Sequence, residues 1–262
     1  MIGPVKQFVG QSVFAAGLHS ALLRNAAVVV AFHHIEGGAA NSLSVDPTTF
    51  ERYCRFFRQH FRVVSLSDLV ARIANGEPLK RQLAITFDDG YMDNFDNAAP
   101  ILEQLGLTAT FFVVTKWIGS AVVPWWERDR QVRPEWMTWD HVRSLHRRGF
   151  DIGGHTQTHV DLGAVTGEVA RREIVGSRLD LEDQLGAPVR AFAYPYGGRH
   201  NVTEANRQLV RAAGYDCCCS CFGGNNGVAT DPFEIRRVPI TPYSTPHQFG
   251  FDIALGLNQF TI

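Results

Sequence analysis

The sequence predicts a single α/β domain whose parallel strands close into a barrel. Short apolar runs, several of them rich in β-branched residues, alternate with helical stretches from about residue 26 to the C-terminus, and no Ser/Gly/Pro-rich linker divides the chain. Glycine follows most of the helical stretches, as expected where a helix returns to a strand. About seven or eight strands joined by single helices must run parallel and most economically form a barrel. An open doubly wound sheet is the alternative, although no glycine-rich phosphate loop follows the first strand.

Length and composition fit this architecture. The 262 residues, of which 45% are hydrophobic and only 19% charged, are enough to bury a large core. The 25 Lys and Arg residues balance the 26 Asp and Glu residues, so nucleic acid is not an expected partner. No apolar run approaches the length of about 20 residues that a transmembrane segment requires. The first residues lack the pattern of a secretory signal, and five cysteines do not form an even disulfide set, so we expect a cytoplasmic protein.

Eight segments have the apolar composition of strands. They cover residues 26–32, 61–64, 83–87, 109–114, 150–153, 189–194, 215–219 and 234–238. Asp46 and Pro47 supply an N-cap and a first-turn proline for a helix that continues to Phe61. Further helices are expected at residues 69–73, 94–105, 140–148, 167–185 and 203–213.

Residues 1–25 form a separate N-terminal amphipathic segment ahead of a main domain at residues 26–262. Its apolar residues are Phe8, Val9, Val13, Phe14, Leu18, Leu22 and Leu23. We expect this face to pack against the barrel or a partner rather than to bind a membrane.

The strand at residues 83–87 ends in two adjacent carboxylates, Asp88 and Asp89, followed by Gly90. Neighbouring side chains of a strand point to opposite faces, but a turn at Gly90 can bring both carboxylates into one pocket. Two acids in one pocket can divide the work of metal binding and proton transfer. An ordinary Asp-Gly turn is the alternative interpretation of this run alone.

Two histidines, His155 and His159, follow the strand at residues 150–153. Histidines four residues apart lie on one face of a helical turn, within reach of a single metal ion. With one carboxylate they make the three-ligand set of a catalytic zinc-like centre that keeps a position open for water. Such an ion lowers the pKa of bound water to about 7, so a second carboxylate can take its proton at neutral pH.

A third run, Phe192 to Gly197, ends another predicted strand at the same edge. Its proline and glycine impose an irregular backbone that can direct the N–H of Tyr196 toward a developing oxyanion. An aromatic turn without such a role is the alternative.

Together the three runs resemble the polysaccharide deacetylase family, the NodB-like carbohydrate esterases. The family pattern is Thr-Phe-Asp-Asp-Gly, then His-Ser/Thr-x-x-His, then an Arg-x-Pro-Tyr-Gly-like run, and the resemblance extends over roughly residues 26–255. It implies a distorted (β/α)7 barrel that removes N-acetyl or O-acetyl groups from a glycan or glycan precursor and releases acetate. It further implies that Asp88 is the general base, that the Tyr196 N–H stabilises the tetrahedral intermediate, and that a divalent metal, most commonly Zn²⁺, binds to Asp89, His155 and His159.

The chain departs from the family pattern at two positions. Ala193 stands where better-known members have an arginine that orients the base, and Arg236 or Arg237 could supply the missing cation. The late Leu-x-His, whose imidazole protonates the leaving amine, has no counterpart near the C-terminus.

An early Phe-His-His-Ile run offers a candidate for that acid, because barrel closure makes the first strand a neighbour of the last. The run resembles one found early in family members that modify exopolysaccharides. We assign the acid to His33, with His34 as the alternative; a histidine that merely caps the strand is the other interpretation.

All five tryptophans lie between the strand at residues 109–114 and the helix that begins near Asp140, in a stretch with the composition of a long loop on the catalytic edge. One or two of them could stack on sugar rings, while the others pack the loop. We assign Trp125 and Trp126, together with Arg237, to substrate binding.

The cysteines between residues 217 and 221 lack the two-residue spacers of a zinc site and are expected to form a buried strand.

The leading hypothesis is therefore a metal-dependent deacetylase of an acetylated glycan. A metal-dependent hydrolase of another C–N amide in a small molecule is the second hypothesis, and a closed pocket would favour it. The departures at Ala193 and at the late histidine motivate a third, a non-catalytic carbohydrate-binding relative.

Overall fold

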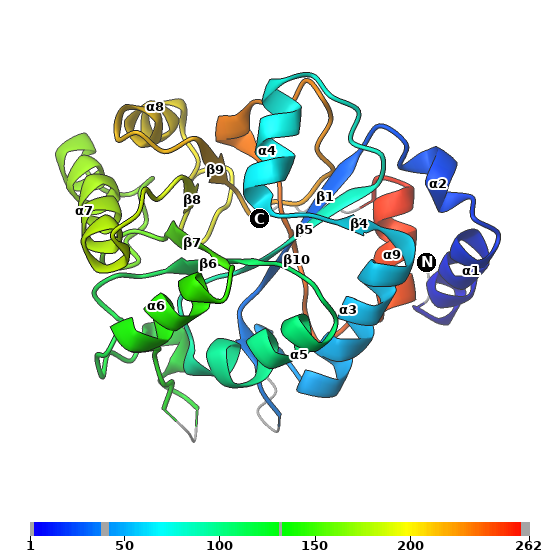
Figure 1. Cartoon of the computed structure of the whole chain (residues 1–262), viewed down its shortest axis with the longest axis horizontal. Helices are drawn as coiled ribbons and strands as arrows, with labels where there is room; N and C mark the ends of the chain where they lie inside the picture. Colours follow the sequence, from blue (N-terminus) through cyan, green and yellow to red (C-terminus); the bar gives the residue numbers. More distant parts are fainter. Residues whose placement is uncertain (1–2, 38–41, 131–132, 258–262) are drawn as a thin grey trace.

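The computed structural model describes residues 3–37, 42–130 and 133–257, and its centre is a curled sheet of parallel strands (Figure 1). The strand order is β10-β1-β5-β6-β7-β8-β9, and β4 pairs beside the start of β5. The strands are β1 (Ala27–Phe32), β4 (Arg62–Val63), β5 (Gln82–Phe87), β6 (Thr110–Val113), β7 (Asp151–Gly154), β8 (Ala191–Ala193), β9 (Cys217–Cys219) and β10 (Val238–Pro239).

The residues before β10 close the sheet into a ring. The N–H of Ile235 donates to the carbonyl of Cys218 at 3.0 Å, and the N–H of Ser220 donates to the carbonyl of Ile235 at 2.8 Å. Val238 then pairs with Val30 of β1. The predicted distorted (β/α)7 barrel is thus confirmed. The predicted strand at residues 234–238 is wrong except at Val238, because Glu234 ends a 3-10 helix and Ile235 forms only an isolated bridge to Cys219 of β9.

Helices surround the sheet, and most begin with a side-chain cap. Asp46, Ser65, Thr166 and Thr203 each accept a hydrogen bond from the N–H three residues later. The α-helices are α1 (Gly3–Ala15), α2 (His19–Leu22), α3 (Pro47–His60), α4 (Leu66–Ala74), α5 (Ala99–Gln104), α6 (Trp139–Arg147), α7 (Gly167–Leu185), α8 (Glu204–Ala212) and α9 (Pro246–Ala254).

Helix α9 and two short strands were not predicted from the sequence, and the predicted helix 94–105 differs from the structure at its start. The missed strands, β2 (His34–Ile35) and β3 (Ser44–Val45), pair with each other outside the barrel. Helix 94–105 begins as a π-helical turn at Asn94–Ala98 before α5. None of the described helices is long and apolar enough to cross a membrane.

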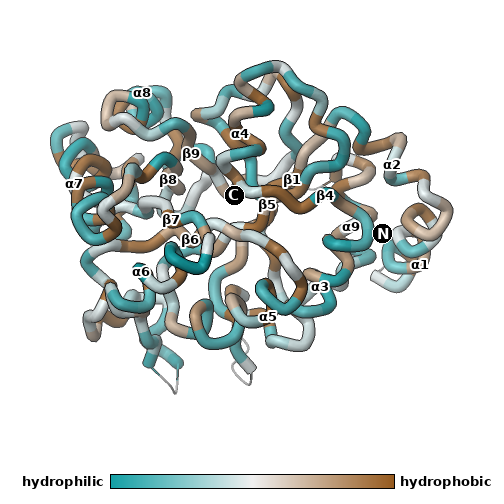
Figure 2. Tube along the Cα trace, in the orientation of Figure 1, coloured by the Kyte–Doolittle hydropathy of each residue, from teal (hydrophilic) through white to brown (hydrophobic). Residues whose placement is uncertain are grey.

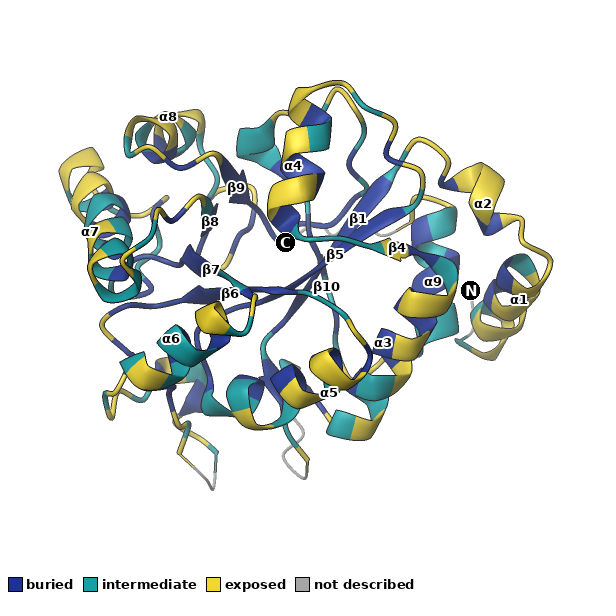
Figure 3. Cartoon of the chain, viewed as in Figure 1, coloured by how far each residue is buried: buried dark blue, intermediate teal, exposed yellow. Residues whose placement is uncertain are grey.

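Two apolar cores lie on the two faces of the curled sheet, and strand alternation assigns each side chain to one of them. On β1, Val28 and Val30 pack outward against the helices, whereas Val29 points into the barrel, where α4 closes one end. Strands β1, β5 and β6 are accordingly largely apolar and buried along their length, whereas the short strand β4 is partly exposed (Figures 2 and 3). On β5, Ala84 is in the inner core and Ile85 in the outer one, so the alternation points the next inward positions, Thr86 and Asp88, to the barrel interior.

The N-terminal helix α1 packs against α9 beside the barrel (Figure 1). The contact is close at Gly10, where a Cβ atom would lie 2.1 Å from the carbonyl oxygen of His247. The predicted apolar face is only partly covered: Phe14 is buried, whereas Phe8 is 70% and Leu18 57% exposed. Packing against the barrel is thus seen for part of this face, and packing of its exposed part against a partner stays a prediction.

Candidate active site

The carboxyl ends of the barrel strands bring the sequence motifs together around one cavity of about 360 Å³. Parallel strands end at the same edge, so β1, β5, β7 and β8 each supply a side chain to it. The lining residues are His33, Ser42, Leu43, Asp88, Asp89, Trp125, Trp126, His155, His159, Tyr194, Tyr196, Cys221 and Pro239.

Asp89, His155 and His159 converge on one point. The Nε2 atoms of His155 and His159 lie 3.4 and 3.2 Å from the same oxygen, Oδ1 of Asp89. Nδ1 of His155 lies 2.8 Å from the carbonyl oxygen of Ala193; as that bond needs an N–H, Nε2 is left with its lone pair toward Asp89. Asp89 Oδ1 is buried and has no hydrogen-bond partner within the described residues. An orphaned carboxylate oxygen facing two imidazole nitrogens fits a divalent metal.

The backbone at Asp89 is strained, which accounts for its place beside Asp88. Its φ is +73°, a value that residues with a side chain rarely adopt, and Gly90 follows with φ +91°. This turn carries the carboxylate of Asp89 to the same side as that of Asp88, as the sequence analysis expected from Gly90.

The two histidines do not lie on a helical turn, so that part of the prediction is wrong. Residues 155–159 form an irregular bend in which Thr156 has φ +63° and His159 has φ +59°. Glu173 of α7 holds the bend, because its carboxylate accepts the N–H groups of Gln157 and Thr158, both at 2.9 Å. Sequence reasoning missed Glu173, since nothing in a helical stretch singles out one buried acid.

We expect Glu173→Gln to weaken metal binding about tenfold or more and to lower the free energy of unfolding by about 1–3 kcal/mol, because an amide cannot accept all the bonds that the carboxylate accepts. Metal titration and denaturant unfolding measure the two effects. Glu168→Gln, an exposed change in the first turn of the same helix, is the matched control. Equal metal affinity in both variants would show that the bend does not depend on Glu173.

Asp88 forms a bidentate ion pair with Arg237 inside the barrel. Oδ1 and Oδ2 of Asp88 accept from the two terminal nitrogens of Arg237 at 2.6 and 2.8 Å. Arg237 also donates to Thr86 Oγ1 at 3.1 Å and to the carbonyl of Ser220 at 2.8 Å. Burial by itself raises the pKa of Asp88, but Arg237, and next His155, outweigh it and hold the pKa below its ordinary value.

The placement of Arg237 corrects its assignment to substrate binding. Its side chain is 0% exposed, and its guanidinium donates to Asp88, Thr86 and the carbonyl of Ser220. It therefore cannot reach a ligand in the cavity. It lies instead where it can orient the carboxylate of Asp88, the role for which Arg236 was the alternative. Arg236 is partly exposed and 4.0 Å from Glu234, away from Asp88.

The two early histidines separate at the end of β1. Nε2 of His33 lies 3.9 Å from Oδ2 of Asp88, and His33 lines the cavity. His34 turns away from the cavity and lies 2.6 Å from Asp93. The structure therefore brings His33, and not His34, beside Asp88.

Tyr196 lies at the cavity edge with φ +62°, followed by Gly197 with φ +66°. A Cβ at residue 197 would lie 2.7 Å from Cys221, so glycine is required there. The backbone N–H of Tyr196 has no hydrogen-bond partner among the residues that the structure describes and stays available for a ligand.

Of the five tryptophans, two lie on the cavity and two fill the loop. Trp125 is 64% exposed, and the ring of Trp126 lies 4.9 Å from that of His159. Trp117 and Trp136 are buried and pack with Tyr91 beneath them. The structure thus places Trp125 and Trp126 on the cavity, and their contact with a substrate stays a prediction.

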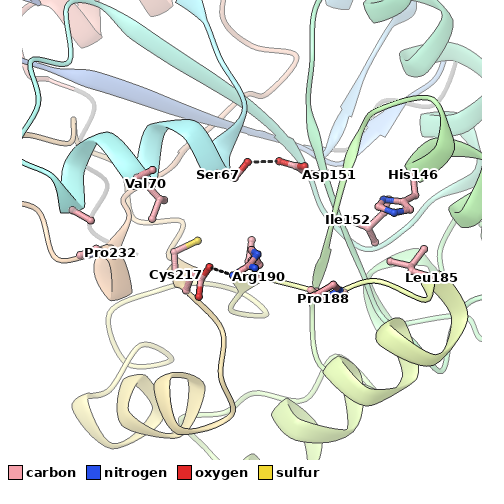
Figure 4. Close-up of a pocket in the computed structure, with 15 residues that line it drawn as sticks. Ser67, Val70, His146, Asp151, Ile152, Leu185, Pro188, Arg190, Cys217 and Pro232 are labelled. Atoms are coloured by element: carbon pink, nitrogen blue, oxygen red, sulfur yellow. Dashed lines mark hydrogen bonds and ion pairs between the residues drawn. The ribbon is translucent and has the colours of Figure 1, made fainter.

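A larger cavity, of about 570 Å³, lies at the opposite end of the barrel between α4 and the amino ends of β7, β8 and β9 (Figure 4). Ser67 donates to Asp151 at 3.1 Å, and Arg190 pairs with Asp216 at 2.8 Å. Burial raises the pKa of Asp151. The cavity contains none of the motif residues. Cys217 on its wall is free and buried, as predicted for that run.

Comparison with known proteins agrees with this geometry. Residues 75–218 match the family described as polysaccharide deacetylase. The chain is 24% identical to the putative polysaccharide deacetylase YxkH of Bacillus subtilis, over 85% of this chain and 74% of that protein. It is 26% identical to the poly-beta-1,6-N-acetyl-D-glucosamine N-deacetylase of Escherichia coli over 73% of this chain, which corresponds to only 33% of that longer protein.

Solved structures show the same fold. The deacetylase PplD of Streptococcus pyogenes, solved with acetate, has a TM-score of 0.73 at 22% identity and covers 86% of this chain and 97% of its own. IcaB from Ammonifex degensii has a TM-score of 0.72 at 21% identity, and the match covers 86% of this chain and 96% of IcaB. With the family match extending over more than half of the chain and the motif residues gathered at one end of the barrel, this protein belongs to the polysaccharide deacetylase family.

Proposed function

We propose that the protein is a metal-dependent deacetylase that hydrolyses N-acetyl groups on the sugar residues of a glycan. The observation that carries the proposal is the convergence of Asp89, His155 and His159 beside a second, ionised carboxylate, Asp88, in one cavity. One acid would hold the ion, and the other would remain free to move a proton.

The donor set supports zinc. Two imidazole nitrogens and one carboxylate oxygen, all buried, form the three-ligand arrangement of catalytic zinc sites. A Zn²⁺ ion bound there would lower the pKa of a water molecule and polarise the acetyl carbonyl.

The surrounding residues would carry the proton transfers. Asp88, kept ionised by Arg237, would take the proton from the attacking water. Burial is the largest influence on the pKa of His33 and lowers it, against the opposing effect of Asp88, so the imidazole would be neutral before reaction. It could then pass the proton from Asp88, 3.9 Å away, to the leaving nitrogen. The free N–H of Tyr196 would donate to the developing oxyanion.

The exposed edge of the cavity favours an extended substrate. Trp125 and Tyr196 are 64% and 44% exposed there, and flat aromatic faces of this kind stack on sugar rings. The Escherichia coli relative is named for an N-acetylglucosamine polymer, and we propose a substrate of the same class for this chain. A small amide in a closed pocket, the second hypothesis, agrees less well with this open edge.

Metal removal tests the proposal directly. The chelated protein is expected to release no acetate from N-acetylglucosamine oligomers, and one equivalent of Zn²⁺ per chain should restore release. Acetate assay and elemental analysis together measure this. Protein that holds metal yet deacetylates no acetylated glucosamine oligomer would contradict the proposed function, and release that survives full chelation would contradict the metal.

A further inference from the structure

A group of charged side chains lies beside the active-site cavity and has no part in the chemistry described above. We call it the His34 cluster: His34, Glu36, Asp93, Glu127 and Arg130. It joins three separate loops, those that follow β1, β5 and β6. The side chain of Glu127 is 0%, that of His34 2% and that of Arg130 11% exposed.

The cluster is continuously bonded. Nδ1 of His34 lies 2.6 Å from Asp93, and its Nε2 lies 3.3 Å from Glu127 and 3.0 Å from Arg130. Both ring nitrogens therefore have partners whether Nε2 donates to Glu127 or accepts from Arg130. Arg130 in turn donates to Glu127 at 2.7 Å and to Glu36.

The charges of the cluster nearly cancel. Three carboxylates face Arg130 and His34, and burial, which lowers the pKa of His34, is outweighed by Asp93 and Glu127, which raise it to about 9. Tyr91 is a further titratable neighbour among the residues that the structure describes, and its ring lies 3.5 Å from that of His34. Buried, charge-assisted hydrogen bonds of this kind are stronger than neutral ones and hold a loop in one position.

The cluster continues into the aromatic side of the cavity. Glu127 directly follows Trp125 and Trp126 in the 3-10 turn at Trp125–Glu127. The hydroxyl of Tyr91 donates to Glu127 at 3.4 Å and accepts from Nε1 of Trp126 at 3.1 Å. The long loop after β6 has little regular structure of its own, so side-chain bonds must supply its order.

We propose that the His34 cluster is a positioning device that holds Trp125 and Trp126 against the cavity and thereby sets the affinity for a glycan chain. The inference rests on the proposed function for its substrate, but not for its structural part. His34, Glu36 and Asp93 also place ligand atoms within 4.8 Å of one another, as a second metal site would. Arg130 already supplies the positive charge there, which favours the positioning role.

Arg130→Met tests the proposal, with Arg128→Met as the matched control, because Arg128 is exposed on the same loop and forms no side-chain bond with the described residues. We expect Arg130→Met to raise KM for an N-acetylglucosamine oligomer at least about fivefold while kcat changes less than about twofold, since the metal ligands and the base are untouched. Glu36→Gln, which removes the charge that faces Arg130 and His34 but leaves the bonds of Arg130 and His34 to Glu127 in place, should give a smaller change of the same kind.

Two measurements without substrate separate this inference from the proposed function. Acrylamide quenching of tryptophan fluorescence and amide exchange of residues 122–130 should both increase in Arg130→Met and stay unchanged in Arg128→Met. Unchanged quenching and exchange in Arg130→Met and Glu36→Gln, or an effect on kcat equal to that on KM, would overturn the positioning role. A second equivalent of zinc that is lost in His34→Gln would overturn it in favour of a metal site. If no variant or wild-type protein releases acetate, the proposed function fails, while a loosened loop in Arg130→Met still supports the cluster.

Discussion

Replacing Asp88 by asparagine is expected to lower kcat for acetate release by about 10²–10⁴-fold and to leave the metal content unchanged. The amide has nearly the shape of the carboxylate but cannot take a proton from water. The proposed ligands, Asp89, His155 and His159, do not include Asp88, so elemental analysis should still find one ion per chain.

The control for this change is Asp96→Asn, an exposed acid-to-amide substitution that should have no effect on turnover. Comparison of kcat and metal content for the two variants and the wild type decides the outcome. Full activity in Asp88→Asn would remove Asp88 from the mechanism, whereas absence of acetate release from both the wild type and the variant would favour the non-catalytic hypothesis.

Replacing Arg237 by methionine is expected to lower the free energy of unfolding by about 3–5 kcal/mol at neutral pH and to reduce turnover strongly. Methionine leaves the carboxylate of Asp88 buried without its bidentate partner, and an unpaired buried charge has a cost of this size. The pKa of Asp88 should then rise, because burial raises it and Arg237 is the largest influence that lowers it.

The direction of the pKa shift of Asp88 determines how the stability loss in Arg237→Met depends on pH. In the wild type the pKa of Asp88 is depressed, so its stabilising contribution is present above the ordinary pKa and is lost only as the pH falls through the folded-state value. In Arg237→Met the pKa is raised, so Asp88 takes up a proton earlier on acidification. The stability difference between the two proteins should therefore be largest near neutral pH and should narrow as the pH falls.

Arg236→Met is the matched control, because Arg236 is the adjacent, partly exposed arginine whose carboxylate neighbour lies 4.0 Å away. It should change the free energy of unfolding by less than about 1 kcal/mol. Denaturant unfolding at several pH values and the acid limb of the activity profile measure these effects. Equal effects of the two substitutions would show that the ion pair with Asp88 has no special role.

Strand alternation explains why much of the fold and of the site was predictable. Apolar runs and glycines located seven barrel strands, and the end of β5 placed Asp88 on the inward face. Strand alternation does not predict the position of the Asp89 side chain. Its φ of +73° is a conformation that the local sequence disfavours and that only the surrounding contacts can hold.

For His155 and His159, too, the sequence predicted one part of the arrangement and distant contacts decided the rest. A spacing of four residues correctly suggested that the side chains of His155 and His159 lie together, but the assumed helical turn is absent. The bend that brings them together depends on Glu173, which lies on a separate helix. Contacts between elements distant in sequence leave no local pattern, so a single sequence could not reveal this one.

The order of residues was enough to establish a parallel α/β barrel with acids and histidines at one end, because strand period, helix caps and motif spacing are local properties. The choice between Arg236 and Arg237, the separation of His33 from His34, and the cluster that anchors Trp125 and Trp126 came only from the folded chain. Each depends on how the last strand closes the ring or how one loop meets another. Such contacts between distant elements are set by packing over the whole molecule, and no short stretch of sequence specifies them.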